Sequence, residues 1–208
     1  MSKPNTKAQT MSSPLQVYAE TTPNPATMKF VVNLPLLPNQ SAEFSSPEMA
    51  GTDDLIGALF RFSYIKSVYI ASNFVTLTKI EGVEWYERMN EIRTYIRDFL
   101  EAGNPVITKM PPKKQAIQPL GQEPLLESEV DAKITEILDE YIRPAVEQDG
   151  GEVAYRGFKE GTVYVAMRGS CAGCPSSTLT LKAGIEQLLK RMVPGVEQVV
   201  AENDLEEV

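Results

Sequence analysis

The stretch TVYVAMRGSCAGCPSSTLTLKAGIEQLLKRMV, residues 162–193, changes its pattern twice. Val163, Val165 and Met167 recur at every second position and would share one face, and this period of two is typical of a β-strand. From Pro175 onward, apolar residues recur every three to four positions, which predicts an amphipathic helix that ends near Val193. The loop between them is rich in Gly and Ser and holds both cysteines of the chain. The stretch therefore predicts a strand, a short loop and a helix.

The segments on either side complete an α-β-β-α-β order. Upstream, residues 130–142 place apolar side chains on one helix face, and we expect this helix to end at Pro144. Residues 152–158 form a second strand, which a turn before Thr162 joins to the first strand as a β-hairpin. Residues 196–201 are the final strand. The cysteine loop therefore lies at a strand-to-helix junction.

Residues 15–102 predict a separate α+β unit, a small sheet with helices on one face. The expected strands are residues 15–20, 28–34, 65–70 and 74–79, and the expected helices run from Thr52 to Phe60 and from Val83 to Leu100. Thr52 is the expected N-cap of the first of these helices. Residues 35–51 have a weak, loop-like pattern with room for only a short strand at 42–44.

The chain thus predicts an α+β protein of two small domains joined by a Pro-rich linker. Its length of 208 residues suits two domains of ordinary size. The linker, GNPVITKMPPKKQAIQPLGQEPL, has five prolines and no periodicity, so it should be extended and semi-rigid and allow the domains to move. The expected boundaries are a disordered tail at 1–14, the first domain at 15–102, the linker at 103–125, the second domain at 126–201 and an acidic tail at 202–208.

Composition and charge exclude several classes of function. No apolar run reaches the roughly 18 residues of a membrane span. The first fourteen residues lack the apolar core of a signal peptide and the arginines of an import sequence. The formal net charge of −8 lies entirely in residues 127–208, because residues 1–126 carry as many basic as acidic side chains. We therefore expect a cytoplasmic protein that binds neither membranes nor nucleic acid.

The two cysteines, Cys171 and Cys174, form a CxxC motif just before the predicted helix. The chain has no other cysteine and no histidine. Pro175 suits the first helical position, so both thiols should lie near a helix N-terminus, where unpaired N–H groups lower a thiol pKa below about 8.5. Gly169 and Gly173 allow the loop to turn both sulfurs toward one point. The pair is therefore a candidate metal or redox site.

Four interpretations of the pair are open on these residues. Buried cysteines can be apolar fillers, although the surrounding glycines and the helix start disfavour this. A thiol-disulfide oxidoreductase usually has a proline inside the pair, whereas Pro175 follows it. Structural zinc and an iron-sulfur cluster each need about four ligands, and one chain offers two thiols. A metal site therefore requires both thiols from each of two chains, which predicts a two-fold dimer with the metal on its axis.

The segment IRPAVEQDGGEVAYRGFKEGTVYVAMRGSCAGCPSSTLTLKAGIEQLL, residues 142–189, resembles the C-terminal domain of NifU, the Nfu domain. The family pattern includes RPAxxxDGG, the hairpin, GxCxxCPSSxxTLKxGIE and a closing helix, and the resemblance covers residues 127–201. One departure is Gly195, where many relatives have an acidic residue. The segments YAETTPNPATMKF and FVTLTK are similar to the N-terminal domain of eukaryotic-type Nfu proteins, over residues 16–102.

The resemblance implies a non-enzymatic iron-sulfur cluster carrier or scaffold. Its cofactor would be a [4Fe-4S] cluster held between the subunits of a homodimer by Cys171 and Cys174 of each chain. The implied partners are upstream cluster assembly machinery and the apo iron-sulfur client proteins that receive the cluster. Without cluster, the chain should be monomeric or loosely associated. For the first domain we expect client docking, because a flexible linker keeps the cluster domain close to any bound client.

Overall fold

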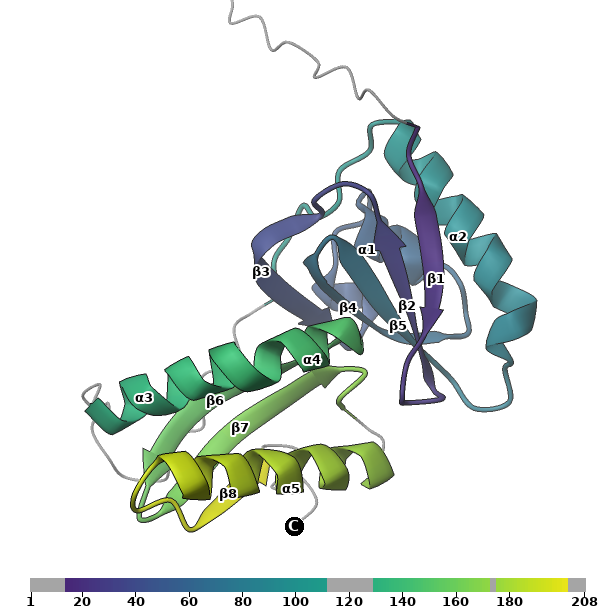
Figure 1. The fold of residues 1–208 in the computed structure, drawn as a ribbon. Helices are drawn as coiled ribbons and strands as arrows, with labels where there is room; N and C mark the ends of the chain where they lie inside the picture. The colour runs from purple at the N-terminus through teal and green to yellow at the C-terminus, as the bar shows by residue number, and fades with distance from the viewer. Residues whose placement is uncertain (1–13, 112–128, 173–174, 202–208) are drawn as a thin grey trace, which may run out of the picture.

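The computed structural model describes residues 14–111, 129–172 and 175–201. The chain folds into two α+β units with separate hydrophobic cores, a five-stranded antiparallel domain followed by an α-β-β-α-β domain (Figure 1). The predicted fold class is confirmed at this level. The predicted tails apart from Pro14, most of the predicted linker and Cys174 lie outside the described residues.

The first domain is built on a sheet whose neighbouring strands are all antiparallel. The strands are β1 (Val17–Thr21), β2 (Thr27–Val32), β3 (Leu37–Phe44), β4 (Ile65–Ser72) and β5 (Phe74–Lys79), in the spatial order β1-β2-β5-β4-β3. The helices are the short 3-10 helix η1 (Pro47–Met49), α1 (Leu55–Leu59) and α2 (Trp85–Glu101). Residues of α1 and α2 pack with one face of the sheet around Phe30, Val75 and Ile92, all fully buried.

The edge strand β3 is longer than the sequence predicts. Residues 35–51 show no strand period, yet residues 37–44 pair with β4, with a register shift in the interval that contains Asn39. The backbone of Asn39 has a positive φ of 58°. Only Ala42 and Phe44 of this strand are buried. Because an edge strand with one buried end carries little apolar alternation, its pairing cannot be recognised from residue types.

The first helix, α1, begins later than predicted. Its N-cap is Asp54 rather than Thr52, and Asp54 Oδ1 accepts a hydrogen bond from Gly57 N at 2.9 Å. The carboxylate of Asp54 also accepts from the backbone N and the hydroxyl of Thr108, both at 2.8 Å. These bonds hold the start of the predicted linker against the first domain.

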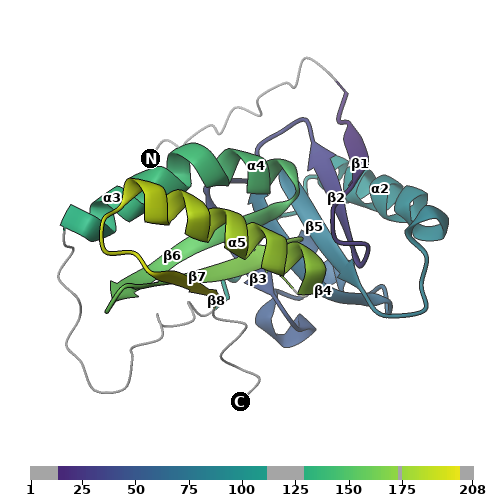
Figure 2. The same ribbon diagram turned by 60° about the horizontal axis from the view of Figure 1, so that its bottom comes forward.

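The second domain has a three-stranded sheet in the order β6-β7-β8. Its elements are α3 (Glu129–Ile137), the π-helical turn η2 (Leu138–Ile142), α4 (Arg143–Gln148), β6 (Gly151–Lys159), β7 (Thr162–Gly169), α5 (Pro175–Met192) and β8 (Gln198–Ala201). β6 and β7 are antiparallel, whereas β7 and β8 are parallel and α5 crosses between them. Figures 1 and 2 show α3–α4 and α5 side by side on one face of this sheet. The predicted α-β-β-α-β order is confirmed.

The first helix of the second domain continues past Pro144, so the predicted helix end is wrong. α3 passes into the π-helical turn at Leu138–Ile142, and α4 begins at Arg143, with Pro144 in its first turn. Proline has no backbone N–H and its ring clashes with the preceding turn of an α-helix. A wider π turn at this point lets the chain accommodate the proline and keep its helical direction as far as Gln148.

The two domains meet where turns of the second domain face the first domain's sheet (Figures 1 and 2). Gly150 precedes β6 and Gly169 ends β7, and their φ angles are 81° and 61°. A Cβ at Gly150 would lie 2.8 Å from Thr76 Oγ1, and a Cβ at Gly169 would lie 2.8 Å from Tyr69 Cδ1. Glycine is therefore required twice, for its backbone conformation and for the close approach of the first domain. The cysteine loop begins immediately after Gly169.

Candidate metal centre

The cysteine loop starts as a tight turn at the end of β7. Cys171 N donates to Arg168 O at 3.3 Å and Ala172 N donates to Gly169 O at 3.2 Å. The Thr178 hydroxyl, in the first turns of α5, donates to Cys171 O at 3.1 Å. These bonds place Cys171 between the end of a strand and the start of a helix, as the sequence predicts.

The thiol of Cys171 points into the second domain. Cys171 is 7% exposed and packs in the same hydrophobic cluster as Ile134 and Ile185. Its sulfur lies over Gly151, so close that a Cβ there would be 2.4 Å from Sγ. In this conformation Cys171 is a core residue, and a metal bound by it requires the loop to turn outward.

The expected decrease of the thiol pKa is wrong for Cys171. Burial raises the pKa of Cys171 to about 11, and the nearby charge of Asp149 acts in the same direction. Hydrogen bonding with Ser170 and a backbone hydrogen bond oppose this shift but are smaller in effect. Burial disfavours the charged form, and Cys171 lies four positions before Pro175, so the helix end does not compensate.

Cys171 should therefore titrate well above an ordinary thiol. In a full-length Cys174→Ser variant, the ¹³Cβ chemical shift of labelled Cys171 is expected to change with a midpoint of about 11. The same chain in urea should titrate at about 8.5. Because the folded chain holds this proton more tightly, the thiol stabilises the fold below about pH 8.5, and this contribution is lost as the pH rises from there toward the folded pKa. A midpoint near that of the urea sample would contradict the buried thiol.

A single chain does not supply a complete metal site in the part that the structure describes. Among residues 14–111, 129–172 and 175–201, no three His, Cys, Asp or Glu side chains are grouped to hold a metal ion. Cys171 and Cys174 are the only thiols in the sequence. Soft thiolates suit iron-sulfur clusters and zinc, and both prefer about four ligands. Two thiols on a loop fit half of such a site.

Two residues of the first domain that the sequence pattern did not mark as functional contact this loop or the end of β7 just before it. The side chain of Asn24, between β1 and β2, donates to Ser170 O and Ala172 O at 3.3 and 3.0 Å. Glu43 Oε1 accepts from Gly169 N at 3.1 Å. The TTPNPAT turn identifies Asn24 as a turn residue, but its contact with a loop 148 positions away depends on how the domains pack.

Two family models match the chain, one for each domain. Residues 17–103 match the N-terminal domain of the scaffold protein Nfu/NifU, and residues 134–200 match the NifU-like domain. A solution structure of a NifU-like protein from Saccharomyces cerevisiae is a weaker match, with a TM-score of 0.41 at 20% identity over 52% of this chain and 99% of that chain. That likeness is too low to support an inference.

Curated relatives match almost the whole chain, among them the following three. The human mitochondrial NFU1 iron-sulfur cluster scaffold homolog is 39% identical over 88% of this chain and 72% of its own length. A NifU-like protein of Schizosaccharomyces pombe is 36% identical over 92% of this chain and 74% of its own. The mitochondrial NifU-like protein 5 of Arabidopsis thaliana is 35% identical over 92% and 69%.

These relatives overturn the expected cytoplasmic location, since two of the three carry "mitochondrial" in their names. The physical basis of that expectation was a first segment without arginines, which is a weak criterion. Within the described residues, no helix combines the length and the apolar character needed to cross a membrane.

The family of the chain follows from two kinds of comparison that agree. Both domains match family models of Nfu/NifU proteins, and a relative that is 39% identical covers most of the chain. The chain belongs to the Nfu/NifU family of iron-sulfur cluster scaffold proteins.

Proposed function

We propose that this protein is a non-enzymatic carrier that receives an iron-sulfur cluster, holds it between two copies of the chain and passes it to apo-proteins. The observation that carries the proposal is the CxxC loop between β7 and α5 in a domain that matches the NifU-like family model. Cys171 and Cys174 are the proposed ligands, and each chain contributes both.

The cluster is proposed to be of the [4Fe-4S] type. A cubane of this kind is bound by about four thiolates, and two chains with two cysteines each supply that number. The donors come from a loop rather than from a closed cage, so the cluster is held at a surface that separation of the subunits can open. This suits a cargo that must be released.

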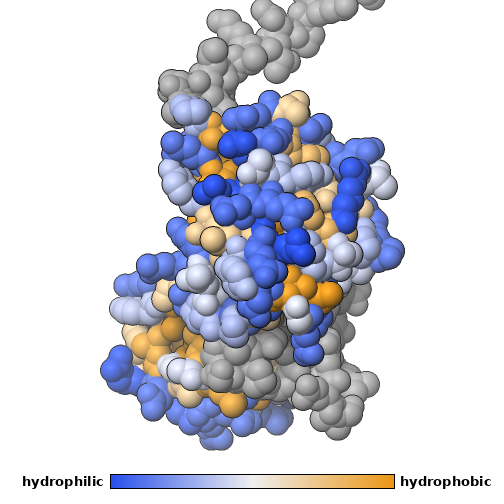
Figure 3. All heavy atoms as spheres, turned by 90° about the vertical axis from the view of Figure 1, so that its right-hand side faces the viewer, coloured by the Kyte–Doolittle hydropathy of each residue, from blue (hydrophilic) through white to orange (hydrophobic). Residues whose placement is uncertain are grey.

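Association of two chains has a candidate surface on the second domain. Figure 3 shows a face of the molecule on which hydrophobic side chains gather on the second domain, the lower body in that view. Leu179, in α5 shortly after the cysteine loop, is 64% exposed. It is this gathering of hydrophobic side chains, rather than a single exposed leucine, that supports close approach of a second copy once cluster ligands are shared.

The alternative function is a CxxC thiol-disulfide oxidoreductase. Disulfide exchange begins with attack by an accessible thiolate. Cys171 is buried, and burial raises its pKa to about 11, so this thiol is neutral near pH 7. In this conformation the sulfur is a poor nucleophile and an equally poor metal ligand. The preference for a carrier therefore rests on the match to the NifU-like family model.

The proposed partners are the upstream proteins that supply the cluster and apo iron-sulfur proteins that receive it. The names of the human and Arabidopsis relatives place those proteins in mitochondria, and we propose the same compartment for this chain. Carrier and client would then share one compartment.

Anaerobic reconstitution with iron and sulfide tests the carrier function. The full-length chain is expected to gain broad visible absorbance and about four iron atoms per two chains. Light scattering should show a dimer only in the cluster-loaded form, because cluster binding and association are thermodynamically linked. A loaded protein that stays monomeric would contradict the shared site. A colourless protein that reduces insulin would favour the oxidoreductase, and one zinc per dimer would favour a structural site.

A further inference from the structure

The face of the first sheet that points away from its core carries one row of side chains across all five strands. Directly paired residues of antiparallel strands point to the same face. Thr76 and Tyr69, in the middle of the row, are only 1% and 2% exposed, so this face is covered. The cross-strand pairs that form the row are Glu20–Lys29, Lys29–Thr76, Thr76–Tyr69 and Tyr69–Glu43.

Turns of the second domain cover this row through hydrogen bonds to their backbone. Side chains of β2, β5 and β3 donate or accept these hydrogen bonds. The contact between the domains therefore depends on both the register of the first sheet and the geometry of the second domain's turns. The Tyr69 ring lies against Gly169. The bonds are Lys29 Nζ to Gln148 O at 3.0 Å, Thr76 Oγ1 to Gly150 O at 2.6 Å and Gly169 N to Glu43 Oε1 at 3.1 Å.

Asn24 extends this contact onto the cysteine loop itself. Its Nδ2 donates to the carbonyls of Ser170 and Ala172, the residues on either side of Cys171. Its Oδ1 accepts from Ala26 N at 3.0 Å, which fixes the orientation of the amide. Asn24 is 3% exposed. One amide group of the first domain thus binds the backbone on both sides of Cys171.

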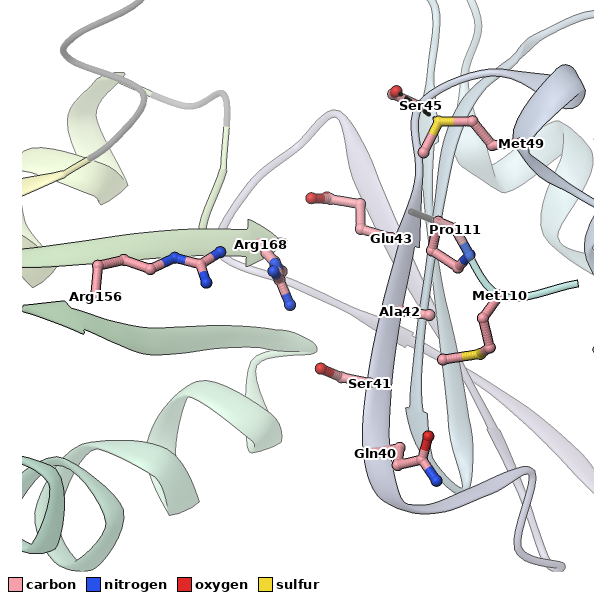
Figure 4. Close-up of a pocket in the computed structure, with 10 residues that line it drawn as sticks. All are labelled: Gln40, Ser41, Ala42, Glu43, Ser45, Met49, Met110, Pro111, Arg156 and Arg168. Atoms are coloured by element: carbon pink, nitrogen blue, oxygen red, sulfur yellow. Dashed lines mark hydrogen bonds between the residues drawn. The ribbon is translucent and has the colours of Figure 1, made fainter. Parts of the chain in front are cut away.

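The rest of the junction contains further polar contacts and a cavity with a mixed polar and apolar lining. Figure 4 shows Ser41 and Glu43 of β3 on one side of a cavity of about 510 Å³, with Arg156 and Arg168 of the second domain on the other. Ser41 Oγ donates to Glu152 Oε2 across the junction at 2.6 Å. The two hydrophobic cores do not merge. Polar contacts beside a cavity are typical of domains that can separate without unfolding.

We propose that this face of the first domain is a docking surface for the cysteine loop and acts as a latch. With the domains together, Asn24 holds the loop so that Cys171 stays inside the second domain, and separation of the domains frees the loop to turn its thiol outward. The inference rests on the proposed function, because a loop that shares a cluster with a second chain must first leave the core. The first domain then controls access to the ligand loop.

The latch is tested on the iron-free full-length chain with Cys174→Ser, in which Cys171 is the only thiol. Asn24→Asp keeps the oxygen that accepts from Ala26 N. It replaces the donating Nδ2 with a second oxygen, which faces and repels the carbonyl oxygens of Ser170 and Ala172. Thr76→Val removes one interdomain hydroxyl and keeps its shape. We expect each change to increase the rate of Cys171 alkylation by iodoacetamide about tenfold, equivalent to about 1.4 kcal/mol. The radius of gyration from small-angle scattering should increase as well.

Asn33→Asp is the matched control, because Asn33 Nδ2 donates to Pro14 O within the first domain, at 3.0 Å. This variant should alkylate at the parent rate. Equal rates in all variants would overturn the latch. Separation of the domains without faster alkylation would overturn it too, since the second domain alone would then bury Cys171. Failure of the proposed function would instead appear as missing iron in the reconstituted chain that keeps both cysteines.

Discussion

Cys171→Ala is expected to leave the reconstituted protein without a stable iron-sulfur cluster, and Cys174→Ala is expected to do the same. Either change reduces the thiols of a dimer from four to two, which no longer meets the ligand requirement of a cubane. Iron and sulfide content after anaerobic gel filtration measures the loss. Light scattering should show that both variants remain in the apo association state.

The fold should survive these changes, which separates loss of ligands from loss of structure. Cys171→Ala removes one buried sulfur, and a loss of this size costs about 1 kcal/mol. Ala172→Ser is the control, because it alters the loop between the cysteines and keeps both thiols. Circular dichroism should be unchanged in all three variants. A single cysteine variant that retains a full cluster would refute the shared site, because other groups would have to complete it.

Asp54→Ala is expected to destabilise the first domain by about 3–5 kcal/mol. Asp54 is fully buried, and its carboxylate accepts from Gly57 N, Gly51 N and both donors of Thr108. Alanine would leave these donors buried without a partner, and each such donor costs about 1–3 kcal/mol. It would also release the segment around Thr108 from the first domain.

Fluorescence of Trp85 follows this unfolding selectively, because it is the only tryptophan of the chain and packs in the first domain's core. A loss of this size should lower Tm by about 15 °C or more. Asp53→Ala is the matched control, since Asp53 is exposed, and a surface change of this kind stays within about 0.5 kcal/mol. Equal melting curves for the two variants would show that the buried carboxylate does not anchor the segment.

Local patterns in the sequence were sufficient to predict most of the second domain. The apolar stripe of α5 is confirmed by the complete burial of Ile185 and Leu189. The hairpin of β6 and β7 follows from a period of two on each side of a short turn. Such signals come from residues two to four positions apart. They belong to the segment itself and do not depend on what it packs against. The CxxC spacing and its place at a strand-to-helix junction are local in the same sense.

The tertiary structure decided the features that depend on distant residues. β3 became a strand because β4 offers it a pairing edge, although its own residues are mostly polar. The carboxylate of Asp54, which caps α1 through Gly57 N, also accepts from Thr108, 54 positions away, and this long-range contact holds the start of the predicted linker on the first domain. Cys171 became a core residue because it packs in one cluster with residues of α3, α5 and the sheet, and this burial raises the pKa of its thiol. The contact of Asn24 with the cysteine loop joins residues of separate domains. Burial and hydrogen-bond partners are properties of packing, and no periodicity within one segment encodes them.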